Sequence, residues 1–296
     1  MAIRLGVDTL CYHCRLVEKE ISLAEVIDEV AGVGAEFVQL NALHLEGYGQ
    51  HGLDELRRRA QDRGMFFTLA GDFLGRAAHG ATVEEGAERV AGWLTLAERL
   101  GSPYMRCASG FYRQELQGRP DLIAREQRFV IEVLRRSAER NDSQAQILLE
   151  NHSDFTPEEY IGIIDAVGQS AVGVFLDVIN PISVMADPLE TVRALAPLAP
   201  AGHVKDYRMV SNYVPDRFHR TGFEIQWCYP GEGVADLPEL LGAIAAVGRE
   251  EDYLLSIEGL DNRPGVADQA ERLKGSFAVL GSILAGLPNH DEQKVS

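Results

Sequence analysis

The chain has 296 residues, of which 46% are hydrophobic and 25% are charged. This composition supplies enough apolar side chains for one large core or two small ones and excludes global disorder. The 45 acidic residues outnumber the 28 basic ones, and the formal net charge is -17 at pH 7. A field of that sign repels phosphate backbones and anionic lipid surfaces, so nucleic acids and membranes are poor candidate partners.

The first residues and the cysteines indicate the compartment. The start, MAIRLGVDTLCYH, lacks the long apolar core of a signal peptide, and no later stretch has the length of a membrane span. The four cysteines are too few and too unevenly placed for a disulfide framework. Cys11 and Cys14 form an isolated CxxC without a second pair, for which we expect no metal or redox role. We expect a soluble, cytoplasmic protein.

Strand-length apolar runs alternate with helix-length amphipathic segments along the whole chain. The eight predicted strands are residues 4–10, 37–43, 65–70, 104–108, 146–150, 172–177, 202–205 and 253–258. The eight predicted helices are residues 22–33, 53–63, 83–100, 121–140, 157–167, 188–195, 237–247 and 267–284. Ser22 with Glu25 and Thr156 with Glu159 have capping-box spacing, which predicts two of the helix starts.

Strands that alternate with helices must be parallel, and eight such units close most economically into a barrel of the size of this chain. A doubly wound open sheet is the rival fold, but its usual Gly-rich first turn is replaced here by DTLCYH. No linker marks a second domain. We therefore predict an α/β fold with a single (β/α)8 TIM barrel over residues 1–288 and a frayed polar tail over 289–296.

Chemistry in a parallel barrel collects at the carboxyl ends of the strands, and the last four predicted strands all end in potential metal ligands. These residues are Glu150, Asp177, His203 and Glu258. Because neighbouring strands lie close together, three carboxylates and one imidazole would share a small volume and repel one another without a cation. The oxygen-rich set favours Mn²⁺, Mg²⁺ or Co²⁺, and it does not exclude Zn²⁺.

The segments LLENHSDFTPEE, VGVFLDVINP, HVKDY, PGEGVADL and SIEG, in that order and at barrel spacing, resemble the xylose isomerase-like TIM barrel superfamily of sugar isomerases and epimerases. The resemblance covers nearly the whole chain and is most specific from Glu150 onward. It places the four metal ligands of the superfamily on the same four residues as the strand-end argument. We expect one divalent metal, with manganese as the first choice and magnesium, cobalt or zinc as alternatives.

The resemblance also implies a reaction. A metal that holds a carbonyl and an adjacent hydroxyl oxygen stabilises the enediolate left when a carbon-bound proton is removed. In related ketose epimerases two ligand glutamates face opposite sides of the substrate carbon, which would make Glu150 and Glu258 the acid/base pair. His152, two positions after Glu150, is a further candidate base or substrate contact, or it orients Glu150.

Other residues at strand ends and in the long segment 207–235 are candidate substrate contacts. They are Lys205, Asn180, Arg106, His44 and Trp227. Lys205 could neutralise an enolate oxygen, hold a carboxylate or pair with Asp206. Asn180 stands where many relatives carry His, and Gln39 where many carry Glu, so the sequence departs from the usual pattern at two polar contacts. The aromatic residues of 207–235 could wall a pocket or pack against a second subunit.

Two further classes of enzyme within the superfamily are alternatives to an isomerase or epimerase. ENHSDFT and LDVINP are also similar to lyases that cleave 3-keto-C-glycosides and to decarboxylases or dehydratases of keto-sugar acids. Such a lyase could need a small partner subunit, whereas an isomerase or epimerase could be a homo-oligomer. An abasic-site DNA endonuclease needs more metal ligands and an electropositive groove, which a net charge of -17 disfavours. A non-enzymatic binding protein would be expected to have lost ligands.

Overall fold

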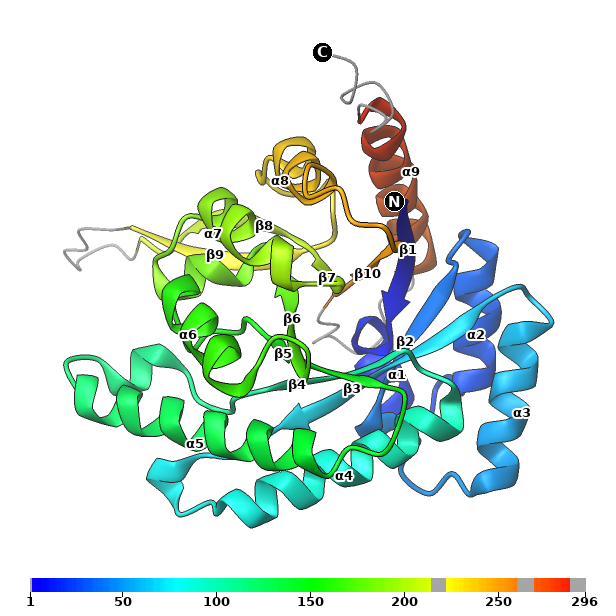
Figure 1. Ribbon diagram of the computed structural model, residues 1–296. Helices are drawn as coiled ribbons and strands as arrows, with labels where there is room; N and C mark the ends of the chain where they lie inside the picture. Colours follow the sequence, from blue (N-terminus) through cyan, green and yellow to red (C-terminus); the bar gives the residue numbers. More distant parts are fainter. Residues whose placement is uncertain (1, 214–221, 260–268, 288–296) are drawn as a thin grey trace.

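A computed structural model describes residues 2–213, 222–259 and 269–287 of the chain (Figure 1). Eight parallel strands close into a barrel in the order β1-β10-β7-β6-β5-β4-β3-β2. Their bounds are β1 Ile3–Asp8, β2 Phe37–Asn41, β3 Phe66–Phe73, β4 Tyr104–Ala108, β5 Gln146–Glu150, β6 Val172–Asp177, β7 Ala201–Val204 and β10 Tyr253–Ile257. The barrel closes where β1 pairs with β10, with Ile3 opposite Tyr253.

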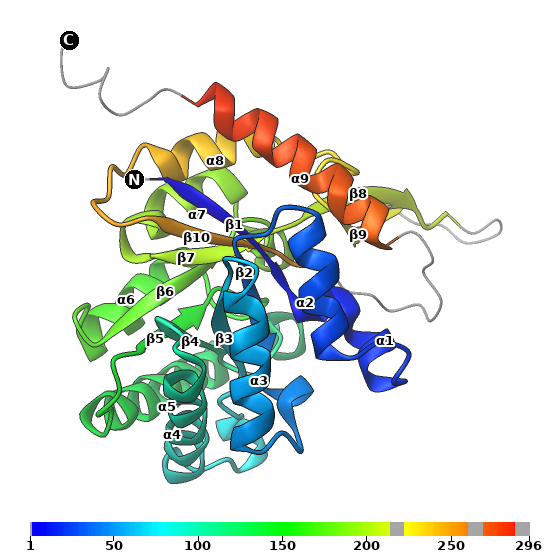
Figure 2. The same ribbon diagram turned by 90° about the vertical axis from the view of Figure 1, so that its right-hand side faces the viewer.

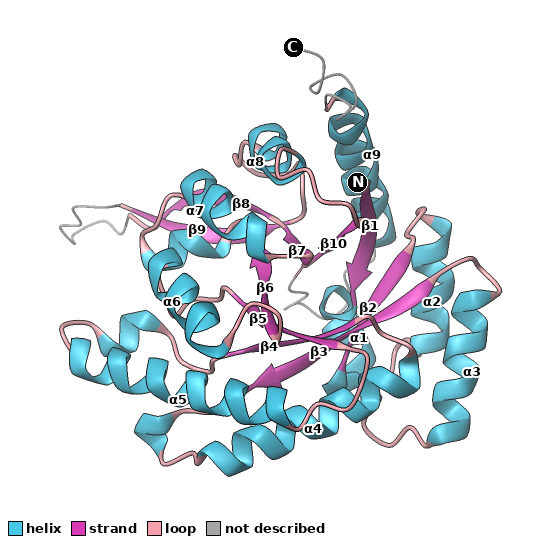
Figure 3. Ribbon diagram, viewed as in Figure 1, coloured by secondary structure: helices cyan, strands magenta, loops and turns pink. Residues whose placement is uncertain are grey.

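Helices lie between the strands and surround the barrel, as Figures 2 and 3 show. The helices that follow the strands are α2 Leu23–Gly32, α3 Gln50–Gln61, α4 Val83–Leu100, α5 Pro120–Glu139, α6 Pro157–Val167, α7 Pro188–Leu195, α8 Leu237–Ala245 and α9 Gln269–Gly286, and a short α1 His13–Val17 precedes α2. The predicted (β/α)8 barrel is thereby confirmed. The predicted tail, 289–296, lies outside the described residues, and the single-domain boundary at 288 stays a prediction.

Local sequence fixes several helix ends. Ser22 and Thr156 each accept a hydrogen bond from the backbone N–H three residues on, and the side chains of Glu25 and Glu159 accept one from the backbone N–H of the cap residue. Both predicted capping boxes are therefore present. Gly101 ends α4 in the left-handed conformation, with φ of 70°, which glycine adopts without steric cost.

An apolar layer fills the barrel directly beneath the candidate metal ligands. It consists of Tyr104, Leu148, Phe175 and Ala201, with Leu254 packed against them. Four of these five stand two positions before Arg106, Glu150, Asp177 and His203, and side chains two apart on a strand share a face. The charged side chains therefore lie directly above a layer of buried, mainly apolar side chains.

Gly202 allows β7 to approach β6 closely beside this layer. A Cβ built there would lie 2.0 Å from the carbonyl oxygen of Leu176 and 2.5 Å from the hydroxyl of Tyr253. Neither neighbour is free to yield, because one is backbone and the other is buried. The position of His203, the next residue, thus depends on a glycine before it.

The long connection between β7 and α8, for which the sequence predicts no strands, contains two paired strands that form a hairpin. Strands β8 Asp206–Ser211 and β9 Phe223–Cys228 pair antiparallel and project beyond the ring of helices (Figure 1). Trp227 of β9 lies opposite Tyr207 of β8. None of the helices among the described residues has the length and apolar character that crossing a membrane requires.

Candidate metal centre

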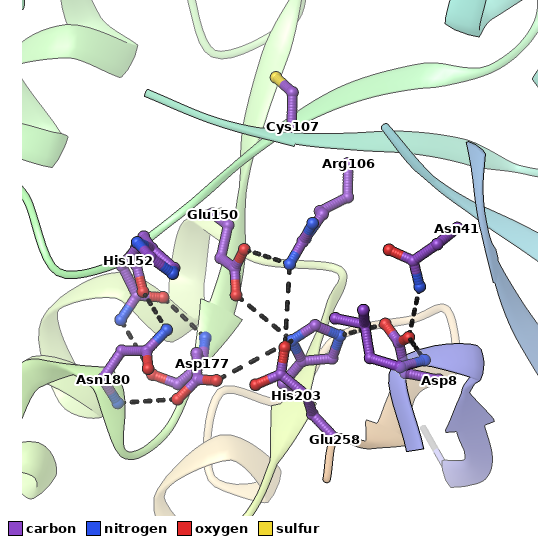
Figure 4. Close-up of polar contacts among 12 residues, drawn as sticks. Asp8, Asn41, Arg106, Cys107, Glu150, His152, Asp177, Asn180, His203 and Glu258 are labelled. Carbon is purple, nitrogen blue, oxygen red and sulfur yellow. Dashed lines mark hydrogen bonds and ion pairs between the residues drawn. The ribbon is translucent and has the colours of Figure 1, made fainter. Parts of the chain in front are cut away.

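Three of the four predicted ligands lie together at the carboxyl end of the barrel. Glu150 ends β5, Asp177 ends β6 and His203 lies in β7, and these three strands are neighbours. One ligand atom from each side chain lies within 4.8 Å of the other two, and all three residues are buried. Figure 4 shows the three side chains pointing toward one another. The strand-end geometry expected from the sequence thus brings this triad together.

Glu258, the fourth predicted ligand, follows β10, and its side chain lies at the same nitrogen of His203 as Glu150 and Asp177. Its Oε1 atom lies 3.5 Å from His203 Nδ1. Its Oε2 atom contacts the ammonium of Lys205, which also lies 2.8 Å from Asp177 Oδ2. Glu258 is therefore adjacent to the triad but is held by an ion pair with Lys205.

Two permanent cations are buried among the carboxylates. Arg106 Nη2 lies 2.6 Å from Glu150 Oε2 and 4.0 Å from Glu258 Oε1, and Lys205 bridges Glu258 and Asp177. Four carboxylates contact this cluster, since Asp8 lies 3.1 Å from His203. With His203 as a neutral imidazole, the form that binds a metal, their formal charge exceeds that of the two cations by two, which is the charge of one divalent ion.

The electrostatic surroundings shift the pKa of each group. Burial raises the pKa of Glu150, but Arg106 and His203 outweigh it and lower the value to about 2. Burial lowers the pKa of His203, because it disfavours the charged form of this group too. The nearby Glu258, Asp8 and Glu150 outweigh burial and raise the pKa to about 10. Glu258 is held well below its usual pKa, chiefly by Lys205 opposing burial.

Asp177 behaves differently from the two glutamates. Burial raises its pKa above the usual range, and the nearby Lys205 opposes that shift only in part. The backbone N–H groups of Ile179 and Asn180 donate to its Oδ1 atom at 2.8 and 2.7 Å. Its Oδ2 atom is the one that faces Lys205 and His203. The carboxylate is therefore oriented by the backbone turn that follows β6.

Asp8 and Gln39 lie on the far side of His203. The sequence reasoning did not assign Asp8 to the site, and it noted Gln39 only as an altered polar contact. His203 Nε2 lies 3.1 Å from Asp8 Oδ2, and the Gln39 amide nitrogen donates to the same oxygen. Asn41, which ends β2, donates to Asp8 Oδ1 (Figure 4). The strand-end rule applies to Asp8 and Asn41 as well, because each ends its strand, but the predicted strands ran two residues too far.

A cavity of about 290 Å³ opens above these residues. Its buried part is polar and includes Glu150, Glu258, Arg106 and Lys205. The residues at its mouth include Leu43, Phe73 and Tyr112, which are 39%, 38% and 43% exposed. A polar floor under an apolar rim is typical of pockets that orient a small polar ligand.

Most of the predicted substrate contacts line this cavity. They are His152, Asn180, Arg106, Lys205 and Trp227. The His152 ring meets the rings of Phe73 and Tyr112 edge to face, with centroids 5.7 and 5.5 Å away. Asn180 donates to the carbonyl oxygen of Asn151, and the Lys205 ammonium lies 5.5 Å from the Trp227 ring centroid.

His44 is placed elsewhere. Its Nε2 atom lies 3.0 Å from His13 Nδ1 and its Nδ1 atom 2.9 Å from Thr9 Oγ1. It lines a separate, neighbouring cavity of about 560 Å³ together with Leu43 and is not among the residues around the carboxylates. Burial lowers its pKa to about 4. The structure therefore ties His44 to the loops after β1 and β2 instead of to the carboxylate cluster.

The residues present fit a divalent metal. Carboxylate oxygens with one imidazole nitrogen suit Mn²⁺, Mg²⁺ or Co²⁺ and tolerate Zn²⁺. Once His203 is a neutral ligand, the buried cluster has an excess of two formal negative charges, which gives a physical reason for such an ion because uncompensated buried charge is costly. Fold and cluster together define a parallel barrel with a candidate metal-binding pocket at the carboxyl ends of its strands.

Comparison with known proteins gives the family. The chain matches the xylose isomerase-like TIM barrel family over residues 27–276 and belongs to it. Comparison with curated proteins by sequence gives no match.

Solved structures share the fold at low sequence identity. The chain is similar to an L-ribulose 3-epimerase, with a TM-score of 0.73 and 16% identity. The match covers 100% of this chain and 99% of that one. It is also similar to the IolI protein with a bound zinc atom, with TM-score 0.71, 16% identity and coverage of 97% and 100%. A probable 3-DHS dehydratase, AsbF of Bacillus anthracis, gives TM-score 0.65, 18% identity and coverage of 94% and 99%. At these identities the similarity establishes the fold alone.

Proposed function

We propose that the protein is a divalent-metal-dependent sugar isomerase or epimerase that removes a proton from a carbon next to a carbonyl group. One observation carries the proposal: Glu150, Asp177 and His203 converge within 4.8 Å at the floor of a pocket, with Glu258 beside them. Two similar structures are an L-ribulose 3-epimerase and a D-psicose 3-epimerase, which supports a ketose as the substrate. Two similar proteins were solved with a bound metal, one with zinc and one with magnesium, which supports a divalent metal in this protein as well. We favour manganese as that metal.

The chain's own residues supply the proton chemistry. A divalent ion held by Glu150, Asp177, His203 and Glu258 would polarise the carbonyl and balance the negative charge that develops on its oxygen. Glu150 is ionised at neutral pH because Arg106 and His203 lower its pKa, and we assign it as the carboxylate that accepts the carbon-bound proton. The apolar layer below excludes water from the base and so strengthens these charge interactions.

Return of a proton to the opposite face is assigned to Glu258. Its low pKa means that it starts the reaction as a carboxylate and must first gain a proton. Lys205, whose ammonium contacts Glu258, holds that carboxylate in place, and the proton that Glu258 gains is assigned to solvent. His152, between Phe73 and Tyr112 at the pocket wall, would hold a substrate hydroxyl or act as an additional base.

Exchange of a substrate proton with deuterated solvent tests the proposal. Protein freed of metal with a chelator and reloaded with Mn²⁺, Mg²⁺, Co²⁺ or Zn²⁺ is incubated with ketohexoses in D₂O and followed by NMR. We expect metal-dependent exchange that falls by about 10²–10⁴ in Glu150→Gln and Glu258→Gln. Glu126→Gln is the control, because that buried carboxylate holds Ala77 and Ala78 outside the pocket.

Two results would contradict the proposal. One is exchange at the parent rate in both glutamate variants with metal retained. The other is cleavage of abasic DNA without any activity on sugars, since the endonuclease reading would then replace this one.

A lyase is the second candidate, and Lys205 is the observation that favours it. An ammonium within contact of two carboxylates at the pocket floor can protonate a departing oxygen or carbon after the same deprotonation. The similarity to a probable 3-DHS dehydratase is in keeping with this reading. Incubation with 3-keto-glycosides and keto-sugar acids decides between the two, because a lyase releases a smaller product and an isomerase conserves the substrate mass.

A further inference from the structure

Asp8, the last residue of β1, is a buried carboxylate whose two oxygens each have their own partners. Its side chain is fully buried. Oδ1 accepts hydrogen bonds from the backbone N–H of Leu10, at 2.7 Å, and from the Asn41 amide. Oδ2 accepts from the Gln39 amide and lies 3.1 Å from His203 Nε2. The carboxylate is therefore fixed in orientation, with one oxygen directed at the imidazole.

Gln39 is held in place as well. Its Oε1 atom accepts hydrogen bonds from the hydroxyl groups of Tyr104, at 3.1 Å, and Ser256, at 3.3 Å. These two donors keep the oxygen of the amide away from Asp8 and direct its nitrogen toward the carboxylate. Residues of β2, β4 and β10 thus combine to prevent Asp8 from rotating.

The two nitrogens of His203 face opposite environments. Nδ1 lies 3.3 Å from Glu150, 3.5 Å from Glu258 and 3.9 Å from Asp177. Nε2 faces Asp8. A neutral imidazole carries one proton, and the nitrogen without it provides the lone pair for a metal.

We propose that Asp8 is a positioning residue of the metal centre: by accepting a hydrogen bond from the Nε2–H group of His203, it makes Nδ1 the metal-binding nitrogen. The inference rests on the proposed function and adds to it the nitrogen used and the group that selects it. Asp8 is not itself a ligand, because both of its oxygens are directed at donors on the far side of the ring. A carboxylate behind a metal-binding histidine fixes its tautomer and raises its basicity.

The Asp8→Asn substitution tests the role with little change of shape. Leu10 and Asn41 donate to Oδ1, so the new amide would keep its oxygen there and turn its NH₂ group toward Nε2. Two donors would then face each other, which favours the tautomer with the proton on Nδ1. We expect Zn²⁺ affinity to fall by about 10- to 100-fold, measured by competition with a chelating dye.

Nitrogen-15 NMR of histidine-labelled protein supplies a readout that loss of stability alone would not change. In the wild type, Zn²⁺ should shift Nδ1 of His203 and leave a protonated Nε2, the resonances being assigned with His203→Asn. Glu126→Gln serves as the control for loss of a buried carboxylate and should keep both the affinity and the spectrum.

The outcomes separate the two proposals. A Zn²⁺ shift at Nε2 of the wild type, or an Asp8→Asn protein with wild-type affinity and spectrum, would overturn the role of Asp8 while leaving the metal centre intact. Absence of any Zn²⁺-dependent shift at His203 would instead overturn the metal centre, and the role of Asp8 with it. The wild-type spectrum gives this decision even when Asp8→Asn fails to fold.

Discussion

At the scale of single residues, the cluster shows how neighbouring charges decide which groups carry protons. Burial disfavours the charged form of both Glu150 and His203, yet each is held in its charged form because the other, together with Arg106 or Glu258, lies within a few ångströms. In this environment His203 has a pKa of about 10 and carries two protons at neutral pH. A metal at Nδ1 must therefore displace one of them.

Metal affinity should accordingly depend on pH. Because the pKa of His203 is raised above the measuring range, the proton is present throughout and each binding event releases it, so apparent affinity should rise roughly tenfold per pH unit between pH 7 and 9. Calorimetric titration in two buffers of different ionisation enthalpy measures the proton released. Binding that is independent of pH would show that His203 is not a ligand.

At the scale of elements, the β8–β9 hairpin is anchored by one side chain at its base. Asp206 is buried and accepts hydrogen bonds from the backbone N–H groups of Tyr207, Gly231, Gly233 and Ala235, at 2.8 to 3.2 Å. A Cβ at position 233 would lie 2.2 Å from the Asp206 carboxylate, so glycine is required there. The anchor fixes the hairpin that places Trp227 over Lys205.

The Asp206→Asn protein should bind substrate more weakly with a smaller change in kcat. An amide has one acceptor oxygen and would leave buried N–H groups unpaired, at about 1–3 kcal/mol for each. We therefore expect KM to rise several-fold and the free energy of unfolding in urea to fall. Asp236→Asn is the matched control, because Asp236 caps α8 through Glu239 and Asn caps a helix equally well. Equal KM values for the two variants would argue against the anchor.

At the scale of the whole molecule, the barrel places four carboxylates where only two permanent cations oppose them. This arrangement lowers the stability of the native state, because like charges in a low-dielectric pocket repel one another. An ion that binds only the folded chain removes the repulsion and shifts the unfolding equilibrium toward the native state.

Thermal unfolding should reflect this coupling. With Mn²⁺ at one hundred times its Kd, the native state gains about 2.7 kcal/mol, and the melting temperature should rise by several degrees over protein kept in a chelator. Asp177→Asn, which removes one ligand of the triad, should lose most of that rise. An equal rise in wild type and variant would place the bound ion elsewhere.

Much of the architecture could be predicted because buried parallel strands are nearly continuous apolar runs. The charged residue that ends such a run marks both the strand boundary and the site, which is why Glu150 and Asp177 were placed correctly at the ends of β5 and β6. Asp8 was missed for the complementary reason: apolar Leu10 extended the predicted strand past it, whereas the chain turns into a 3₁₀ helix at Thr9.

The β8–β9 hairpin could not be predicted from the pattern of apolar residues either. Its strands lie outside the barrel and alternate exposed polar and apolar residues such as Arg208 and Met209, without the continuous apolar signal of the other strands. Contacts formed only by tertiary packing left no pattern either, as the pairing of His44 with His13 shows. Side chains that meet across loops are determined by the closed barrel and not by local spacing.

Because β1 pairs with β10, the pocket can be complete only when the two ends of the chain have come together. Ile3 and Tyr253 are partners across almost the full length of the sequence, and the contact of Asp8 with His203 spans 195 residues. Loop closure over such separations is slow compared with formation of a local strand–helix unit. A nascent chain that has completed its first six strands already holds Glu150 and Asp177 but lacks His203, so the three candidate ligands can meet only after β7 has been added.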